Sequence, residues 1–247
     1  MFKAVLEDVA LLRDSIATIS ELIEEAKFKI KKDGIELLAA DRAVVAVVDF
    51  KFSAKNFKEY DLKSDATIGI NLNNFLQILK RAKSSEILRL ELSDDSFSLI
   101  FEGRSKRKFT LPLIEIREEV PTGIEKLSFP SKVEISSGVL SDGIDDADLV
   151  SDSIVMEVEK DKFMLKAHGD STSAELELKA GEDCKIETKE PVRARYSIDY
   201  LKKMLKAKKL SERVTIALNT NYPLKMSFKY QEGLITLSFI LAPRVEE

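Results

Sequence analysis

Apolar residues recur with helical spacing in two segments that lie about half a chain apart. They occupy positions 72, 75, 76 and 79 in the first segment and positions 198, 201, 204 and 205 in the second. Residues three and four apart share one face of an α-helix, so each segment predicts a helix with one buried stripe. Natural N-caps stand at Asn71 or Asn73 in the first segment and at Ser197 or Asp199 in the second.

The two segments belong to a longer internal repeat. Thr67–Leu92 resembles Arg193–Leu218 at an offset of about 126, and both copies read as strand, helix, strand. Lys27–Leu37 precedes the similar stretch Val155–Leu165 by about 128 positions, and both alternate apolar and polar residues around a turn. In the first copy, Asp33-Gly34 is a typical two-residue hairpin turn. Two matches in the same order at nearly the same offset indicate a duplicated domain.

A stretch of poor periodicity separates the two copies. The sequence IEIREEVPTGIEKLSFP, residues 114–130, contains prolines, a glycine and several acids, which is typical of an exposed linker. We therefore expect an N-terminal domain over residues 1–115, a linker over residues 116–130 and a C-terminal domain over residues 131–247.

Composition narrows the class of protein. The chain has 247 residues, 44% of them hydrophobic and 33% charged, with a net charge of −4. A single Cys184 and a single His168 exclude an internal disulfide and a Cys/His zinc site. The N-terminal residues resemble no secretory leader, and no apolar run is long enough to cross a membrane. We expect a soluble, intracellular protein.

Positive charge is concentrated on two short segments of this acidic chain. Gln77–Glu86 carries three cations within four residues, and Asp199–Glu212 carries five lysines. Residues 137–152, by contrast, hold five aspartates. The spacing of those aspartates lacks the closing glutamate of a calcium loop, so we expect no metal. Nucleophile and base do not share a recognisable motif, and no phosphate-binding glycine loop is present, so we expect neither enzymatic activity nor a cofactor.

Several motifs together resemble the sliding clamps of the proliferating cell nuclear antigen family, in their archaeal form. They are INLNNFLQILKRAK, FTLPLIE, ADLVSDSI, the hairpin KDGIELLAADRAVVAVV and the ending LAPRVEE. The resemblance covers the whole chain. One departure is ADRA at residues 40–43, where archaeal members tend to have Met-Asp-Pro-Ser.

The resemblance implies an α+β DNA-clamp fold with two similar domains per chain. Three chains would close head to tail into a ring around duplex DNA, with antiparallel sheets outside and helices around the hole. The helices expected to face the hole are approximately Asp8–Glu21, Leu72–Ser84, Ser137–Val150 and Ile198–Lys208.

The resemblance also assigns residues to three surfaces. By family position, Arg13, Lys80 and Lys206 would be cations that face DNA. Lys202 lies one turn before Lys206 on the same helical face, and Lys203 and Lys209 are further candidates. The sequence shows no acids matched to the lysines of the last helix. Ion pairs between subunits would join Arg81, Lys83 and Arg107 to Asp142 and Asp146. Strand pairing at that seam would join Lys106–Leu113 to Ser173–Ala180 of a neighbour. A pocket for short partner motifs would include Ala40, Val44, Val45, Val47, Ile124, Leu127, Pro223, Ile240, Leu241, Ala242 and Pro243.

Each of these assignments has an alternative without a functional role. Lysines on exposed helical faces are commonly just solvated, and valines in AVVAVV are equally consistent with strand core. The expected partners are double-stranded DNA, further copies of the chain in a homotrimer, DNA polymerase, clamp loader, flap endonuclease and DNA ligase, without a membrane. The expected location is the cytoplasm in association with DNA, or the nucleus if the source is eukaryotic. A subunit of a heterotrimeric clamp and a non-ring protein–protein adaptor remain the competing interpretations.

Overall fold

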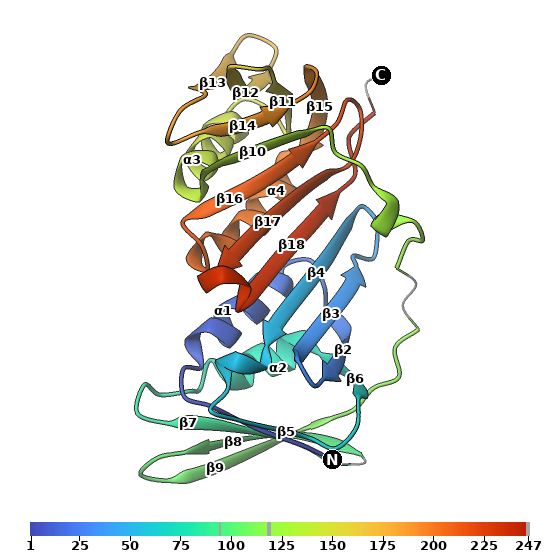
Figure 1. Ribbon diagram of the computed structural model, residues 1–247, viewed down its shortest axis with the longest axis vertical. Helices are drawn as coiled ribbons and strands as arrows, with labels where there is room; N and C mark the ends of the chain where they lie inside the picture. The colour runs from blue at the N-terminus through green and yellow to red at the C-terminus, as the bar shows by residue number, and fades with distance from the viewer. Residues whose placement is uncertain (94, 118–119, 246–247) are drawn as a thin grey trace. The chain divides into compact units, whose positions relative to one another are not determined.

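The computed structural model describes residues 1–93, 95–117 and 120–245 (Figure 1). Residues 118 and 119 of the predicted linker and residues 246 and 247 of the terminal motif lie outside the described residues. The chain divides into two compact units. Unit 1 comprises Met1–Arg42, Val48–Val120 and Tyr230–Leu237, and unit 2 comprises Ala43–Val47, Pro121–Lys229 and Ser238–Glu247. The expected linker and domain boundaries stay predictions.

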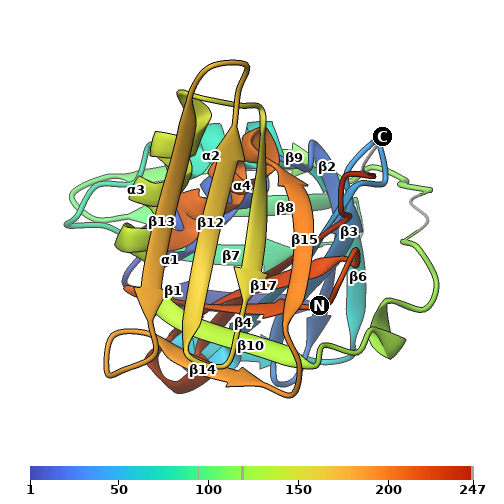
Figure 2. The same cartoon turned by 90° about the horizontal axis from the view of Figure 1, so that it is seen from above.

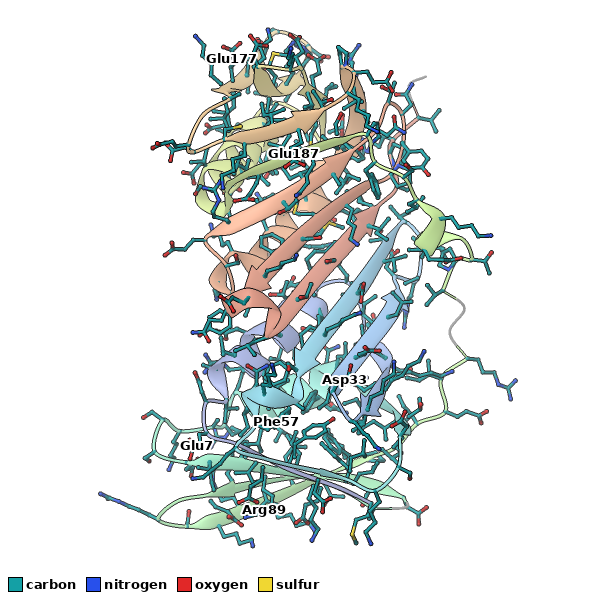
Figure 3. The ribbon with its side chains drawn as sticks, viewed as in Figure 1. Glu7, Asp33, Phe57, Arg89, Glu177 and Glu187 are labelled. Atoms are coloured by element: carbon teal, nitrogen blue, oxygen red, sulfur yellow. The ribbon has the colours of Figure 1, made fainter. Side chains whose placement is uncertain are left out.

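Unit 1 combines two helices with antiparallel strands. Its elements are β1 (Phe2–Leu6), α1 (Ala10–Ile19), β2 (Glu25–Lys31), β3 (Gly34–Ala40), most of β4 (Ala46–Ser53), β5 (Glu59–Leu62), β6 (Ala66–Asn71), α2 (Leu72–Leu79), β7 (Ile87–Leu92), β8 (Ser96–Glu102) and β9 (Lys106–Pro112). One sheet has the order β5-β1-β7-β8-β9, and the other strands follow the order β4-β3-β2-β6. Arg89 (labelled in Figure 3) lies on β7, where its guanidinium pairs with Glu102 of the adjacent β8 and with Glu59 of β5.

Unit 2 repeats this arrangement. Its elements are β10 (Ser131–Ser136), α3 (Ser137–Asp148), β11 (Ser153–Val158), β12 (Lys162–His168), β13 (Ser173–Lys179), β14 (Lys185–Thr188), β15 (Val192–Ser197), α4 (Ile198–Leu205), β16 (Arg213–Leu218), β17 (Leu224–Tyr230) and most of β18 (Ile235–Leu241). The strand orders are β14-β10-β16-β17-β18 and β13-β12-β11-β15. Figure 2 shows the second set side by side, with β13 at its margin.

The order of elements confirms the internal repeat. The series β1-α1-β2-β3 recurs as β10-α3-β11-β12, and β6-α2-β7 recurs as β15-α4-β16. The expected α+β fold with two similar halves is therefore confirmed.

The predicted apolar stripes form part of the two cores. In α2 the buried residues are Leu72, Phe75, Leu76 and Leu79, and in α4 they are Ile198, Leu201, Met204 and Leu205. Full burial of one such side chain contributes about 1.5–3 kcal/mol. Each stripe faces strands of its own unit, α2 against β2 and β6, and α4 against β15. The opposite face of each helix is thereby left for polar side chains.

The helices are shorter than the sequence predicts. Asp8 precedes α1, and its carboxylate accepts a hydrogen bond from the Ala10 N–H. The expected N-cap Asn71 is confirmed, because its side chain accepts from the Asn74 N–H at 3.0 Å. At α4, Ser197 is the N-cap by backbone geometry but makes no capping bond with its side chain. The last turns predicted for α4 form a separate 3₁₀ turn, Lys206–Lys209.

The first hairpin turn differs by one residue from the prediction. Lys31 pairs with Gly34, so Lys32 and Asp33 form the loop and Gly34 begins β3. Gly34 has φ +148°, and a Cβ there would lie 2.2 Å from the Phe52 carbonyl oxygen. The glycine is needed for this close approach of backbones rather than for the turn itself.

Candidate functional site

The lysines of α4 are partly matched by acids, contrary to expectation. The Lys202 Nζ lies 2.6 Å from Asp148 Oδ2 and 3.4 Å from Asp145 Oδ1, both on the neighbouring helix α3. Hydrogen bonding to Asp148 outweighs burial and, with Asp145, raises the pKa of Lys202. Lys203 pairs with Asp199 one turn earlier, at 2.7 Å. Sequence spacing reveals the second pair, which is an i,i+4 pair, but not the first, because that pair depends on how two helices pack.

The remaining candidate cations lie at helix ends or beside an acid. Lys80 and Lys206 are exposed C-cap residues of α2 and α4, where a cation is favoured by the helix dipole. Lys209 is exposed at the end of the 3₁₀ turn after α4. Arg13 of α1 is half-buried, and its Nε lies 2.9 Å from Oδ1 of the adjacent Asp14.

The three predicted seam cations gather at the end of α2 in unit 1. The Arg107 Nη2 donates to the Arg81 carbonyl at 3.0 Å and to the carboxylate of Glu86. That carboxylate also accepts a hydrogen bond from the Lys83 N–H at 3.1 Å. Burial would raise the pKa of Glu86, but the hydrogen bonds from Lys83 and Arg107 outweigh it and lower that pKa. Sequence reasoning missed Glu86, whose only signal is an acid within a cationic segment directly before an apolar strand.

The two predicted seam acids lie on α3 in unit 2. Asp142 and Asp146 are exposed and one turn apart, so they share one helical face. Asp145 and Asp148 lie closer to α4 through Lys202, so the acidic helix presents carboxylates in two directions.

The two strands predicted to form the seam are both edge strands of their sheets. Within the described residues, β9 pairs with β8 alone and β13 pairs with β12 alone. Exposed residues on β9 include Lys106 and Lys108, and those on β13 include Glu175 and Glu177 (labelled in Figure 3). One open edge is therefore basic and the other is acidic.

The strands that correspond to these edges in the other copy each make a further backbone hydrogen bond at or just beyond one end. By the order of the repeat, β4 corresponds to β13 and β18 corresponds to β9. In unit 1 the Ser53 N–H at the end of β4 donates to the Leu234 carbonyl at 2.9 Å. In unit 2 the Ala242 N–H, just after β18, donates to the Val45 carbonyl at 2.9 Å.

The predicted pocket residues differ widely in exposure. Val47 and Leu241 are buried in the core, so they are not accessible to a partner in this structure. Val44 is 55% exposed and has φ +56°, which is rare for a β-branched residue. Those with intermediate exposure are Ala40, Val45, Ile124, Leu127, Pro223, Ile240, Ala242 and Pro243. All but Ala40 belong to unit 2.

In the unusual ADRA segment, Arg42 pairs with Glu24 at 2.6 Å. Both side chains are exposed. Arg42 stands where the archaeal pattern tends to have proline.

The described residues hold neither a candidate metal site nor a candidate membrane span. Among residues 1–93, 95–117 and 120–245, no group of three or more His, Cys, Asp or Glu is placed to hold a metal ion. The same described residues contain no helix with the length and apolarity needed to span a bilayer.

Two family models together match nearly the whole chain. Residues 1–120 match the family description "Proliferating cell nuclear antigen, N-terminal domain", and residues 123–244 match "Proliferating cell nuclear antigen, C-terminal domain".

Relatives named DNA polymerase sliding clamp align over the whole chain. The protein from Thermococcus gammatolerans is 39% identical over 250 residues, and that from Methanobrevibacter smithii is 36% identical over 246 residues. DNA polymerase sliding clamp 1 from Thermococcus kodakarensis is 37% identical over 250 residues. Each alignment covers 100% of this chain and 99% of the relative. The chain therefore belongs to the proliferating cell nuclear antigen family.

Proposed function

We propose that this chain is a DNA polymerase sliding clamp, which closes with two further copies into a ring around duplex DNA and tethers polymerase to it. Sliding clamps of this family are non-enzymatic processivity factors. The observation that carries the proposal is the pair of open, oppositely charged strand edges β9 and β13.

Open strand edges attract other strands, so proteins usually cover or pair them. Pairing β9 of one copy with β13 of the next satisfies both edges by head-to-tail contact, which forms a closed ring when the rotation closes. The lysines of β9 would then face the glutamates of β13. The corresponding strands β18 and β4 already have a further backbone hydrogen bond at or just beyond one end.

Side chains beyond the strands support the same pairing. Arg81 and Lys83 follow α2 and form a cationic group with Arg107 of β9, and Asp142 and Asp146 form an acidic pair on α3. Because α3 packs against β13 within unit 2, the acidic pair accompanies the acidic edge. One chain supplies both halves of the contact, which favours a homotrimer over a heterotrimer.

DNA would be held by charge without reading of its sequence. Phosphates attract lysine and arginine whatever the base sequence, and lysine gives a flexible contact suited to sliding. We assign this role to Arg13, Lys80, Lys202, Lys203, Lys206 and Lys209. The exposed C-caps Lys80 and Lys206 are the strongest members, because they occupy equivalent ends of α2 and α4 in the two copies.

The partner surface would take short apolar motifs. Exposed Val44 and the half-exposed Ile124 and Leu127 offer aliphatic contacts, and two or three anchors would supply most of the affinity. We propose DNA polymerase as the main partner, with clamp loader, flap endonuclease and DNA ligase using the same surface.

The test of this function is topological retention. The chain is loaded with a clamp loader onto a nicked circular duplex, and the bound fraction is isolated by gel filtration before and after a restriction enzyme linearises the DNA. A ring remains on the circle and is lost from the linear product. Equal retention on both forms would refute encirclement and would favour the adaptor interpretation.

A further inference from the structure

The ion pairs between α3 and α4 lie on the helices proposed to face DNA. Lys202 is 43% exposed, and its two partners Asp145 and Asp148 are also largely exposed. These three side chains together carry one net negative charge. The ammonium group of Lys202 is already paired with two carboxylates. A phosphate that approaches Lys202 must therefore compete with both of them.

We propose that Asp145 and Asp148 restrain Lys202 and weaken the grip of the α3–α4 surface on duplex DNA. This inference rests on the proposed function, and it assigns the two aspartates as positioning residues that act through Lys202. The geometry that carries it is the double contact of the ammonium group, at 2.6 Å and 3.4 Å.

The two carboxylates would act by competing with phosphate for Lys202, not by stabilising the fold. Exposed ion pairs contribute little to folding stability, so the contribution of this pair to the fold is small. An anion held beside a cation nevertheless lowers the local potential that attracts phosphate, most strongly within the Debye length of about 10 Å at 0.1 M salt. A weaker grip suits a ring that must move along DNA.

The same charge pattern is absent from the neighbouring lysine of the 3₁₀ turn that also contacts α3. The Lys208 Nζ donates to the Ser141 Oγ at 3.0 Å, which is a neutral partner on α3. The α3 helix thus restrains two lysines in different ways, one with charge and one without. Only the first removes positive charge from the surface.

The test is a double-mutant cycle on duplex binding by the full chain. Binding of a short fluorescent duplex of mixed sequence is measured across a range of KCl concentrations for the wild type, Asp145→Asn/Asp148→Asn, Lys202→Gln and the triple variant. The two asparagines should tighten binding and steepen the dependence of log K on log salt by about 0.9, the value for one added phosphate contact. Lys202→Gln should weaken binding more in the asparagine background than in the wild type.

A matched control separates this mechanism from a general change in net charge. Asp161→Asn/Asp170→Asn removes two carboxylates from exposed loops on neither helix, and its effect should be the same with and without the Lys202→Gln substitution. If the gain from Asp145→Asn/Asp148→Asn persists in full without Lys202, the proposal is wrong. If neither Lys202→Gln nor Lys206→Gln changes duplex binding, the proposed DNA-binding function itself is wrong.

Discussion

Units 1 and 2 share an order of elements but differ in the charge of the surfaces that remain exposed. In unit 1, α2 ends in the cationic segment around Lys80 and Arg81, and the open edge β9 is basic. In unit 2, α3 carries exposed aspartates and the open edge β13 is acidic. Buried positions in both copies keep the apolar pattern, because the core of each unit needs it.

This difference explains how a duplicated chain can specify a ring. The edges β9 and β13 are not equivalent strands of the repeat, because β9 corresponds to β18 and β13 corresponds to β4. Opposite charges at β9 and β13 make the two ends complementary, so the same contact can repeat from chain to chain. The exposed charges of the two units therefore differ at the edges where the chain would meet other chains.

The largest expected effect comes from reversing the charges on one side of the seam. Asp142→Lys/Asp146→Lys should convert the assembly to single chains, because the introduced lysines would oppose Arg81, Lys83 and Arg107. Arg81→Glu/Lys83→Glu should do the same from the other side. Light scattering after size exclusion gives the mass of each variant.

Two controls sharpen that experiment. Glu187→Lys/Glu190→Lys adds the same charge to exposed positions of unit 2 on and after β14, outside α3 and β13, and should leave the assembly intact. Mixtures of the two reversed seam variants pair one inverted surface with the other, and should recover more assembly than either variant alone. An unchanged mass for both single-sided variants would remove these residues from the seam.

Two glycines provide a comparison of backbone packing in the two units. A Cβ on Gly69 of β6 would lie 2.2 Å from the Ile114 carbonyl oxygen, and the N–H of the same Ile114 donates to the Gly69 carbonyl. A Cβ on Gly143 of α3 would instead meet the movable end of Leu176, at 2.5 Å.

Gly69→Ala should therefore lower the free energy of unfolding by about 1–3 kcal/mol, as overpacking typically does. Gly143→Ala should be closer to neutral, because helix propensity favours alanine by about 1 kcal/mol. Chemical denaturation of both variants measures the difference. Equal losses of stability would show that the backbone at Ile114 moves aside as easily as the Leu176 side chain.

Charge reversal at the equivalent helix ends tests whether both units face DNA. Lys80→Glu and Lys206→Glu should each weaken duplex binding and reduce the salt dependence by about 0.9 for each phosphate that the side chain no longer neutralises. Clamp-dependent primer extension should slow, while the solution mass stays that of the wild type. Weaker binding by only one of the two variants would mean that only one unit's helices contact the duplex.

The smallest expected effect is a pH dependence that differs between two carboxylates. The pKa of Glu86 in unit 1 is lowered by its hydrogen bonds despite burial, and that of Glu134 in unit 2 is lowered chiefly by its hydrogen bond with Arg213. A lowered folded-state pKa stabilises the protein above the ordinary glutamate pKa, and this contribution is lost as pH falls through the lowered value.

Glu86→Gln and Glu134→Gln should each make stability less sensitive to pH in that acidic range. Glu86→Gln should cost more at neutral pH, because the Glu86 side chain is 4% exposed whereas that of Glu134 is 31% exposed. Thermal unfolding between neutral pH and the glutamate range measures both slopes. Indistinguishable profiles would contradict the difference in burial.

Local sequence patterns were enough to predict the repeated elements. They did not predict contacts between residues that are distant in sequence. The apolar stripes of α2 and α4 follow from helical spacing, and the Asn71 cap follows from its side-chain chemistry. The turn at Lys32 and Asp33 was displaced by one residue because Gly34 is required by the approach of Phe52, which is distant in sequence.

The candidate site likewise combines features that local sequence patterns predict with features that depend on packing. The exposure of Asp142 and Asp146 agrees with their helical spacing, since both lie on one face of α3. The pairing of Lys202 with Asp145 and Asp148 depends on two helices meeting across 54 residues of chain, which no local pattern encodes. The burial of Val47 and Leu241 likewise depends on packing within the folded unit.

The solution mass of the purified chain tests most directly whether the edges β9 and β13 close a ring. Multi-angle light scattering during size exclusion, at micromolar concentration and moderate salt, should give three times the mass of the 27.8 kDa chain. A mass of one chain under these conditions would contradict the account, because both edges would then remain unpaired in solution.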